Sequence, residues 1–214
     1  MSKHPGIYVD DMHSVRNFGM CYASKSVSPP PKQVVRKSIP YRNGSVDFTC
    51  INGEEYYGDR EVVYVFDVIG DTPFEVTKKV EDFCAWLAPL SDVDIHDDEM
   101  PRHHWHGGCD SIDVDWNDDG YYAKITATFI LYPFMIADNI SKLTVKVGDN
   151  YVYNEGRPAR LTVKPTGSTV TIQVGSVKQT FIGETVADLS IPSGYSTIKV
   201  TGGSAELYWR EERL

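Results

Sequence analysis

The chain has 214 residues, of which 41% are hydrophobic and 24% are charged, a balance typical of folded globular proteins rather than disordered ones. This length allows one large domain or two small ones, each with its own core. The formal net charge of −9 disfavours non-specific binding to nucleic acid or to an anionic membrane.

Targeting signals and disulfide motifs are not evident in the sequence. Residues 1–13 lack the apolar stretch of a signal peptide, and no segment approaches the roughly 20 apolar residues that span a bilayer. The four cysteines, Cys21, Cys50, Cys84 and Cys109, form no C-x-x-C pair. We therefore expect free, mostly buried thiols in a protein that folds in a reducing cytosol.

Alternating apolar residues predict strands in the first half of the chain. The clearest runs are 62–68 and 125–131, in which every second residue is apolar, and Pro133 ends the second run. Between them the sequence predicts one helix near residues 73–88, with Thr72 as its N-cap. Its apolar stripe consists of Phe74, Val80, Phe83, Cys84 and Leu87, and Pro73 and Glu75 complete a capping box with a proline start.

The segment 91–119 is rich in Asp and His and has weak periodicity. Long segments of this kind are often functional or form extended arms, and only 112–116 alternates like a strand. Beyond residue 137 every signal is of short strands and turns, including a Gly175–Ser176 hairpin turn. We expect a mainly β protein with an α+β domain over 1–137 and a β-sandwich or jelly roll over 138–214.

Three groups of residues raise the question of chemistry. His104, His106 and Cys109 are candidate zinc ligands, but their spacing fits no tetrahedral zinc motif, so no metal and no cofactor are expected. The acidic run 92–99 lacks the turn glycine of a calcium loop and is expected to be a solvated loop. Asp10, Asp11 and His13 lack a placed nucleophile, and no G-x-S-x-G, P-loop or H-E-x-x-H motif occurs, so the chain is not expected to be an enzyme.

An ordered set of short motifs resembles the distal tail proteins of long, non-contractile-tailed phages. The motifs are His13-Ser14 with Phe18-Gly19, Pro30-Pro31-Lys32, Ile39-Pro40 with 43–47, Tyr57 with Asp59-Arg60, 85–87, 129–133, 154–159 and 189–194. Three features differ from the family pattern. Tyr41 stands where the family usually has Gly, the His-rich segment 103–106 is not typical of the family, and the second half has no room for an inserted carbohydrate-binding module.

The resemblance implies an N-terminal belt domain that forms a hexameric ring, followed by an outward-facing galectin-like β-sandwich. It implies as partners a tail tube protein, a baseplate hub or tail-associated protein and a receptor-binding protein, with DNA only passing through the pore and no membrane contact. Such a protein is made in the host cytoplasm and resides at the tail tip of the virion. Rings require head-to-tail contacts that close, and we expect Pro30, Lys32, Tyr57 and Arg60, together with 91–119, to provide them.

Two alternatives stay open at this stage. The sandwich could be a carbohydrate-binding module, for which Tyr208 and Trp209 are candidate stacking residues, although alternation places Trp209 in the core. The His-rich segment could belong to a zinc enzyme. The ring predicts self-association, the module predicts glycan binding by a monomer, and the enzyme predicts stoichiometric zinc.

Overall fold

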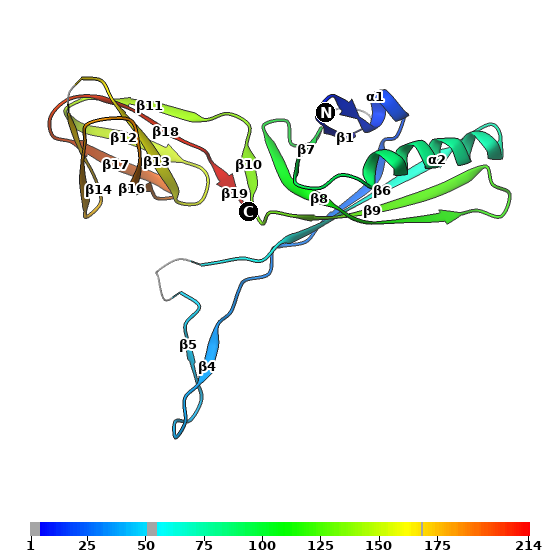
Figure 1. Ribbon diagram of the computed structural model, residues 1–214, viewed down its shortest axis with the longest axis horizontal. Coiled ribbons are helices and arrows are strands. Elements are labelled where there is room, and N and C mark those ends of the chain that lie inside the picture. Colours follow the sequence, from blue (N-terminus) through cyan, green and yellow to red (C-terminus); the bar gives the residue numbers. More distant parts are fainter. Residues whose placement is uncertain (1–4, 51–54, 168) are drawn as a thin grey trace. The chain divides into compact units, whose positions relative to one another are not determined.

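The computed structural model describes residues 5–50, 55–167 and 169–214. The chain divides into two compact units, unit 1 (Met1–Phe134) and unit 2 (Met135–Leu214), whereas the predicted boundary lies between residues 137 and 138. Both units consist mainly of antiparallel strands, so the predicted mainly β fold class is confirmed (Figure 1). No helix within the described ranges is long and apolar enough to cross a membrane.

Unit 1 is one large antiparallel sheet with two helices and a separate hairpin. Its elements are β1 (Ile7–Val9), β2 (Met12–His13), α1 (Ser14–Phe18), β3 (Tyr22–Val27), β4 (Arg36–Ser38), β5 (Ser45–Asp47), β6 (Arg60–Ile69), α2 (Pro73–Leu87), β7 (Val93–Asp97), β8 (His103–Trp116) and β9 (Tyr122–Leu131). The large sheet has the order β2-β1-β7-β8-β9-β6-β3, and β4 pairs with β5 in a two-stranded sheet of their own.

The core of unit 1 lies between α2 and the central strands of the sheet. β6 and β9 pair continuously from Arg60↔Leu131 to Ile69↔Tyr122, and α2 packs on both strands. The apolar alternation predicted for 62–68 and 125–131 is confirmed, because every second side chain of both strands is buried. Burial of one such side chain stabilises the fold by roughly 1.5–3 kcal/mol, which is why the alternation fixes the faces of both strands.

Helix α2 begins and ends close to the predicted positions, but two details differ. Thr72 accepts a hydrogen bond from the Glu75 amide at 3.2 Å, as expected of an N-cap, whereas the Glu75 carboxylate accepts from the amide of Asp71 rather than from that of Thr72. Phe74 is 79% exposed and does not belong to the apolar stripe. The stripe uses Val76 instead, because Phe74 lies in the first turn, on the side away from the sheet.

A short second helix, α1, was missed by the sequence patterns. His13 caps it, because its Nδ1 accepts a hydrogen bond from the Val15 amide at 3.0 Å, and Gly19 ends it with a left-handed φ of 71°. A His N-cap is not among the usual signals, and five residues are too few to show helical periodicity. His13 is 6% exposed, and its Nε2 lies 3.3 Å from the Asp98 carboxylate.

The segment 91–119 is not an extended arm, contrary to our expectation. It forms β7 and the 14-residue strand β8, which pair in the middle of the large sheet. Gly107 marks a tight approach in β8, since its φ is 154° and an added Cβ would lie 2.4 Å from the Ile130 carbonyl oxygen. The apolar pattern did not reveal the whole strand, because the face of β8 that carries Asp113 and Asp115 is polar and open to solvent.

The acidic run is likewise not wholly a solvated loop, because Asp97 is only 2% exposed. Its carboxylate accepts hydrogen bonds from the Tyr22 hydroxyl (2.8 Å), the Tyr64 hydroxyl (2.9 Å), the Lys25 Nζ (2.8 Å) and the Glu99 amide (2.9 Å). Burial raises the pKa of both tyrosines, and the acceptor carboxylate raises it further. Burial alone would lower the pKa of Lys25, but hydrogen bonds to the two carboxylates raise it. This group, here called the Asp97 node, connects β3 and β6 to β7.

Unit 2 is a β-sandwich, as expected. Its elements are β10 (Met135–Ala137), β11 (Ser141–Val145), β12 (Gly148–Asn154), β13 (Ala159–Pro165), β14 (Val170–Val174), β15 (Val177–Phe181), β16 (Thr185–Ile191), β17 (Gly194–Val200), β18 (Ala205–Trp209) and β19 (Glu212–Arg213). One sheet has the order β11-β18-β13-β16, the other has the order β12-β17-β14-β15, and β10 pairs with β19.

The two sheets of unit 2 enclose one apolar core to which both contribute. Gly175 makes the predicted turn between β14 and β15, with a φ of 58°. Trp209 is 7% exposed, which confirms its predicted place in the core. Asn154 is fully buried and closes the loop after β12, since its side-chain amide donates to the Arg157 carbonyl at 2.8 Å and its side-chain oxygen accepts from the Gly156 amide at 3.1 Å.

All four cysteines are free, as expected, but they are not mostly buried: Cys50 is exposed and the other three are half-buried.

Candidate assembly interface

An extended arm leaves the large sheet of unit 1 between β3 and β6. The arm comprises residues 28–59, with 51–54 outside the described residues, and contains the β4–β5 hairpin (Figure 1). Nearly every described side chain from residue 31 to 45 is exposed, so the arm has no core of its own. A paired segment with so little buried area gains little from folding in isolation, and such segments usually contact a partner.

The base of the arm is held by a small set of contacts. Lys32 and Tyr57 form an isolated antiparallel bridge, and the Gly58 amide donates to the Pro31 carbonyl at 2.8 Å. Lys32 and Tyr57 also share one acceptor, because the Lys32 Nζ and the Tyr57 hydroxyl both donate to the Glu55 carboxylate. Hydrogen bonding to Glu55 raises the pKa of Lys32, but the pair is exposed and contributes little stability. These contacts set the direction in which the arm leaves the sheet.

The far end of the arm presents an aromatic side chain to solvent. Tyr41 is fully exposed and adopts a left-handed backbone conformation, with a φ of 65°. A non-glycine residue in this conformation costs roughly 1–2 kcal/mol. The family that the sequence resembles usually has Gly at this position, and the positive φ gives a physical reason for glycine there. Because the Tyr41 side chain is fully exposed, no burial of its ring within the described part of the chain offsets this backbone cost.

The four residues predicted for the interface have different environments. Lys32 is exposed and Tyr57 is half-buried, with its ring edge against Phe134 at a centroid distance of 5.5 Å. Pro30 is buried within unit 1. Both Lys32 and Tyr57 belong to the base of the arm, so they remain candidates, whereas Pro30 shapes the arm rather than presenting a surface.

Arg60, the fourth residue predicted for the ring contacts, is buried rather than exposed. It is 4% exposed, its guanidinium carbon lies 5.1 Å above the Trp105 ring, and burial lowers its pKa. Among the described residues its Nε has no hydrogen-bond partner. The reason lies in the period of two, because Arg60 is the first residue of β6 and shares the buried face of Val62 and Tyr64. Burial in the single chain does not favour the predicted role of Arg60 in the ring contacts, which stays a prediction.

The His-rich segment does not gather the predicted metal candidates at one point. His104 is 6% exposed, with its Nε2 3.6 Å from the Asp94 carboxylate. His106 lies between two carboxylates, with its Nδ1 2.8 Å from Asp94 and its Nε2 3.0 Å from Asp92. Hydrogen bonding to Asp94 and Asp92 raises the pKa of His106 despite partial burial. Within the described ranges, no group of three potential metal ligands contains His106 or Cys109, and burial raises the pKa of the Cys109 thiol to about 11.

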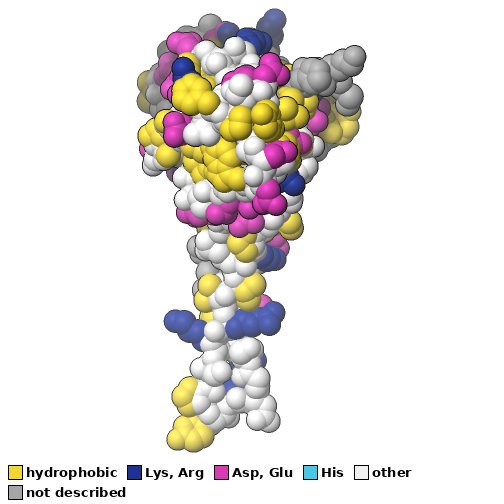
Figure 2. All heavy atoms as spheres, turned by 90° about the vertical axis from the view of Figure 1, so that its right-hand side faces the viewer, with side chains coloured by type: hydrophobic (Ala, Val, Ile, Leu, Met, Phe, Trp, Pro, Cys, Tyr) yellow, Lys and Arg dark blue, Asp and Glu magenta, His cyan; other side chains and the backbone are white. Residues whose placement is uncertain are grey.

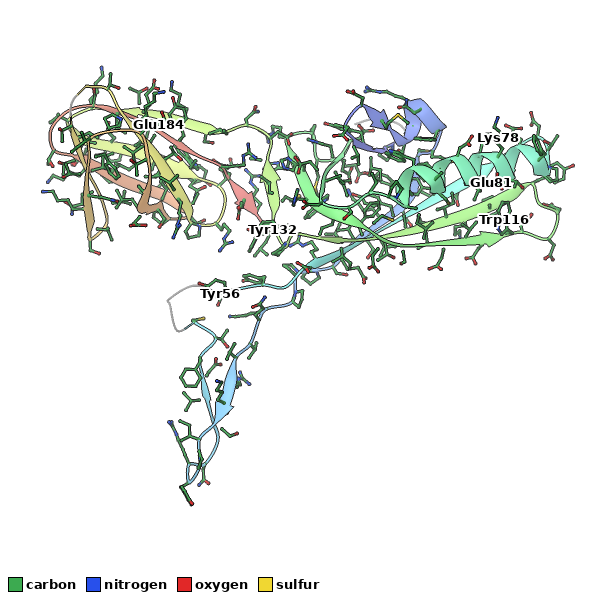
Figure 3. The ribbon with its side chains drawn as sticks, in the orientation of Figure 1. Tyr56, Lys78, Glu81, Trp116, Tyr132 and Glu184 are labelled. Carbon is green, nitrogen blue, oxygen red and sulfur yellow. The ribbon has the colours of Figure 1, made fainter. Side chains whose placement is uncertain are left out.

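A second exposed surface lies at the end of the sheet where β6 leads into α2 and β8 turns into β9. Four large apolar side chains are exposed there, with exposed fractions of 68% for Ile69, 79% for Phe74, 47% for Trp116 and 47% for Tyr121. The elements that carry them are adjacent, because the Gly70 amide donates to the Tyr121 carbonyl. We call these four residues the apolar tip. Figure 2 shows apolar side chains gathered at this end with acidic side chains around them, and Figure 3 labels Trp116 there.

The apolar tip was missed because each of its residues belongs to a predicted element. Phe74 was assigned to the helix stripe, and Trp116 to a short strand. Only the three-dimensional arrangement brings the ends of β6, α2 and the β8–β9 hairpin together. Contiguous exposed apolar patches on a soluble chain usually mark interaction sites.

The fold of the chain is similar to that of a solved phage protein. The Dit protein (gp 19.1) of phage SPP1, whose crystal structure is described as a paradigm of the hub adsorption apparatus in phages infecting Gram-positive bacteria, superimposes with a TM-score of 0.74. The match covers 99% of this chain and 100% of the SPP1 Dit chain. The chain has the fold of SPP1 Dit. The sequences are only 15% identical, so the likeness to SPP1 Dit establishes the fold and not the partners. No protein-family model and no curated protein sequence matches the chain.

The resemblance to distal tail proteins indicated by the sequence motifs is thus confirmed at the level of the fold. Because the match to SPP1 Dit spans both units, it includes the mainly β unit 1 and the sandwich of unit 2. The motifs alone could not establish this, since each consists of loop glycines, prolines and strand residues.

Proposed function

We propose that this chain is a structural protein of a phage virion, a distal tail protein that forms a hexameric adaptor ring. The observation that carries the proposal is the likeness of the fold to SPP1 Dit over nearly the whole of both chains. The role is one of assembly rather than catalysis. The ring joins the tail tube on one face to a baseplate hub or tail-associated protein and a receptor-binding protein on the other. DNA passes through the central pore, and no membrane is contacted.

Two surfaces of unit 1 support the ring. The arm and the apolar tip are both exposed, and they are different surfaces of the same unit. A contact between unlike surfaces is head-to-tail, and head-to-tail contacts close into a ring when the rotation permits. The net charge of −9 favours solubility of the chain in the host cytoplasm before it assembles into the tail tip.

The test is the mass of the full chain in solution, measured by size-exclusion chromatography with light scattering across protein concentrations. The expected result is a species of about six times the chain mass of 24.0 kDa, with a central hole in negative-stain images. A chain that stays strictly monomeric at the highest attainable concentration would contradict the ring.

One observation favours the carbohydrate-binding alternative as a second candidate. On the outer face of β12 and β17, Tyr151, Tyr153 and Tyr195 are 76%, 50% and 87% exposed. The ring centroids of Tyr153 and Tyr195 are 4.6 Å apart, and the angle between the two ring planes is 44°. Exposed aromatic faces can stack on the C–H faces of sugar rings. The residues proposed from sequence do not provide this surface, since Trp209 is buried and the Tyr208 hydroxyl donates to Glu206.

This alternative predicts glycan binding by a monomer. A glycan-array screen followed by titration calorimetry would measure it, with Tyr195→Ser as the binding-deficient variant and Thr171→Ser on the same sheet as the control. If no glycan binds wild type more tightly than Tyr195→Ser, the carbohydrate-binding reading fails.

A further inference from the structure

Charge is unevenly distributed within unit 1, and the arm is its basic part. From residue 32 to 46 the arm contains Lys32, Arg36, Lys37 and Arg42 and no Asp or Glu, although the whole chain has a net charge of −9. Two of these cations have carboxylate partners within the arm, since Lys32 pairs with Glu55 and Arg36 with Asp47.

Lys37 and Arg42 form no ion pair with any described residue. They therefore leave two positive charges at the outer half of the arm. The arm also exposes apolar side chains beside these charges, with exposed fractions of 54% for Val34, 43% for Ile39 and 109% for Tyr41.

The opposite composition occurs beside the apolar tip. Residues 110–119, at the end of the β8–β9 hairpin, contain five Asp residues and no Lys or Arg. Asp113 and Asp115 are exposed on the open face of β8 and form no ion pair with a described residue. Trp116 and Tyr121 from the same hairpin belong to the apolar tip. The open face of β8 is therefore acidic and lies beside the exposed Ile69, with Lys124 of β9 opposite Asp115, whereas Trp116 lies on the α2 face of the same hairpin. The arm, in contrast, is apolar and basic.

We propose that the basic arm of one copy docks on the apolar tip and the acidic β8–β9 hairpin of a neighbouring copy. This inference rests on the proposed ring and names the two surfaces that form each of its contacts. Within the described residues, no hydrogen bond or ion pair joins residues 32–46 to 110–121 of the same chain.

Electrostatics explains why the partner is a second copy. Chains with a net charge of −9 repel one another, so a self-contact forms readily only where opposite charges face each other. The segment 32–46 is strongly basic, and the hairpin segment 110–119 is strongly acidic. Pairing them removes the like-charge contact and covers the exposed Ile69 and Tyr41 at the same time. The arm and the hairpin are different surfaces, so a copy whose arm is docked still has a free hairpin for the arm of the next copy. The contact can therefore continue from copy to copy until the ring closes.

Charge reversal in the full-length chain tests the docking directly. The arm variant carries Lys37→Glu and Arg42→Glu, and the tip variant carries Asp113→Lys and Asp115→Lys. Lys32 and Arg36 are left unchanged because they pair within the arm. The matched control carries Lys178→Glu and Lys199→Glu on the exposed face of unit 2, with the same change in net charge as the arm variant. Circular dichroism checks that each variant is folded.

The measured quantity is the protein concentration at which half of the chain is assembled. We expect at least a ten-fold increase for the arm variant and for the tip variant, and less than a two-fold change for the control. The chain that carries all four substitutions should return to within about three-fold of wild type, because its reversed arm faces a reversed tip.

Mixing gives the sharpest result. The arm variant has negative charges on both surfaces and the tip variant has positive charges on both, so neither assembles alone. A 1:1 mixture places unlike charges at every junction and should assemble as an alternating ring, with equal amounts of both variants by mass spectrometry. A contact within one chain cannot give this rescue.

Two results would overturn the docking. If the folded arm and tip variants assemble as wild type does, the ring uses other surfaces and the proposed function stands without this contact. If both variants lose assembly but neither the four-substitution chain nor the mixture recovers it, the two surfaces do not face each other. A wild-type chain that never assembles would refute the proposed ring and this inference together.

Discussion

Removal of one charge from the Asp97 node should destabilise unit 1 more than any other conservative change of a carboxylate in it. The Asp97 carboxylate is 2% exposed and accepts four hydrogen bonds at 2.8 to 2.9 Å. Asp97→Asn keeps the shape of the side chain but replaces one acceptor oxygen with a donor. In place of Oδ1 that donor faces the Glu99 amide, and in place of Oδ2 it faces the Lys25 ammonium, and neither of these groups can accept a hydrogen bond.

The magnitude follows from the burial of the partners. Loss of one member of a buried ion pair costs about 3–5 kcal/mol, and loss of a hydrogen bond to a charged group about 1.5–3 kcal/mol. Lys25 keeps a second partner, because its Nζ also lies 2.7 Å from the half-exposed Glu99 carboxylate, which limits the loss. We therefore expect the free energy of unfolding to fall by about 3 kcal/mol.

Guanidinium chloride unfolding of the full chain, followed by tryptophan fluorescence, measures this loss. Three of the four tryptophans belong to unit 1, so the signal reports chiefly on that unit. Asp82→Asn on the exposed side of α2 is the matched control, with an expected change within about 0.5 kcal/mol. If Asp97→Asn unfolds at the same denaturant concentration as Asp82→Asn, the node does not stabilise the sheet as argued.

Three further results are expected. Phe83→Ala removes a fully buried ring that contacts Phe66 at a centroid distance of 4.8 Å, and it should lower the free energy of unfolding by about 3–5 kcal/mol; an unchanged denaturation midpoint would contradict this core. His106 has a raised pKa, so its contribution to stability is present below the unfolded-state pKa of about 6.5 and is lost as the pH rises through the folded-state pKa; an NMR titration that places its pKa at or below 6.5 would refute the sign. Gly203→Ala should lower the free energy of unfolding by at least about 2 kcal/mol more than Gly202→Ala, as measured by thermal unfolding. Both glycines have a positive φ, but only at Gly203 would an added Cβ lie 2.2 Å from a backbone oxygen, that of Thr169. Equal losses of stability would rule out the clash.

The parts of the fold that the sequence predicts well are those in which one face is buried. Strands β6 and β9 and helix α2 were found because apolar residues recur with the period of their element, and burial of that face decides the structure. The same alternation also predicts the burial of Arg60, because Arg60 lies two residues before Val62 and therefore on the same face of β6. The charge of Arg60 favours exposure, but its position in the alternation of β6 favours burial, and the position decides.

The functional surfaces are the parts that the sequence predicts poorly, and the reason is physical. The arm has almost no buried side chains, so no periodicity marks β4 and β5, and its hairpin was not predicted. Strand β8 alternates only in its second half, because Gly107 and Gly108 are packed against backbone and contribute no apolar side chain. The apolar tip has no local signal at all, since it exists only where three elements end together.

The structure of the arm base affects the stability of each contact in the proposed ring. Docking a flexible segment costs about 0.5–1.5 kcal/mol for each side chain that is immobilised, in addition to the ordering of its backbone. Three consecutive prolines at 29–31 restrict the backbone before the hairpin, and the Lys32–Tyr57 bridge closes the base. The arm therefore leaves the sheet in a restricted range of directions before any partner is present. Because the base of the arm is already ordered in the monomer, docking has to order chiefly the hairpin beyond it, and this lowers the entropic cost of each junction.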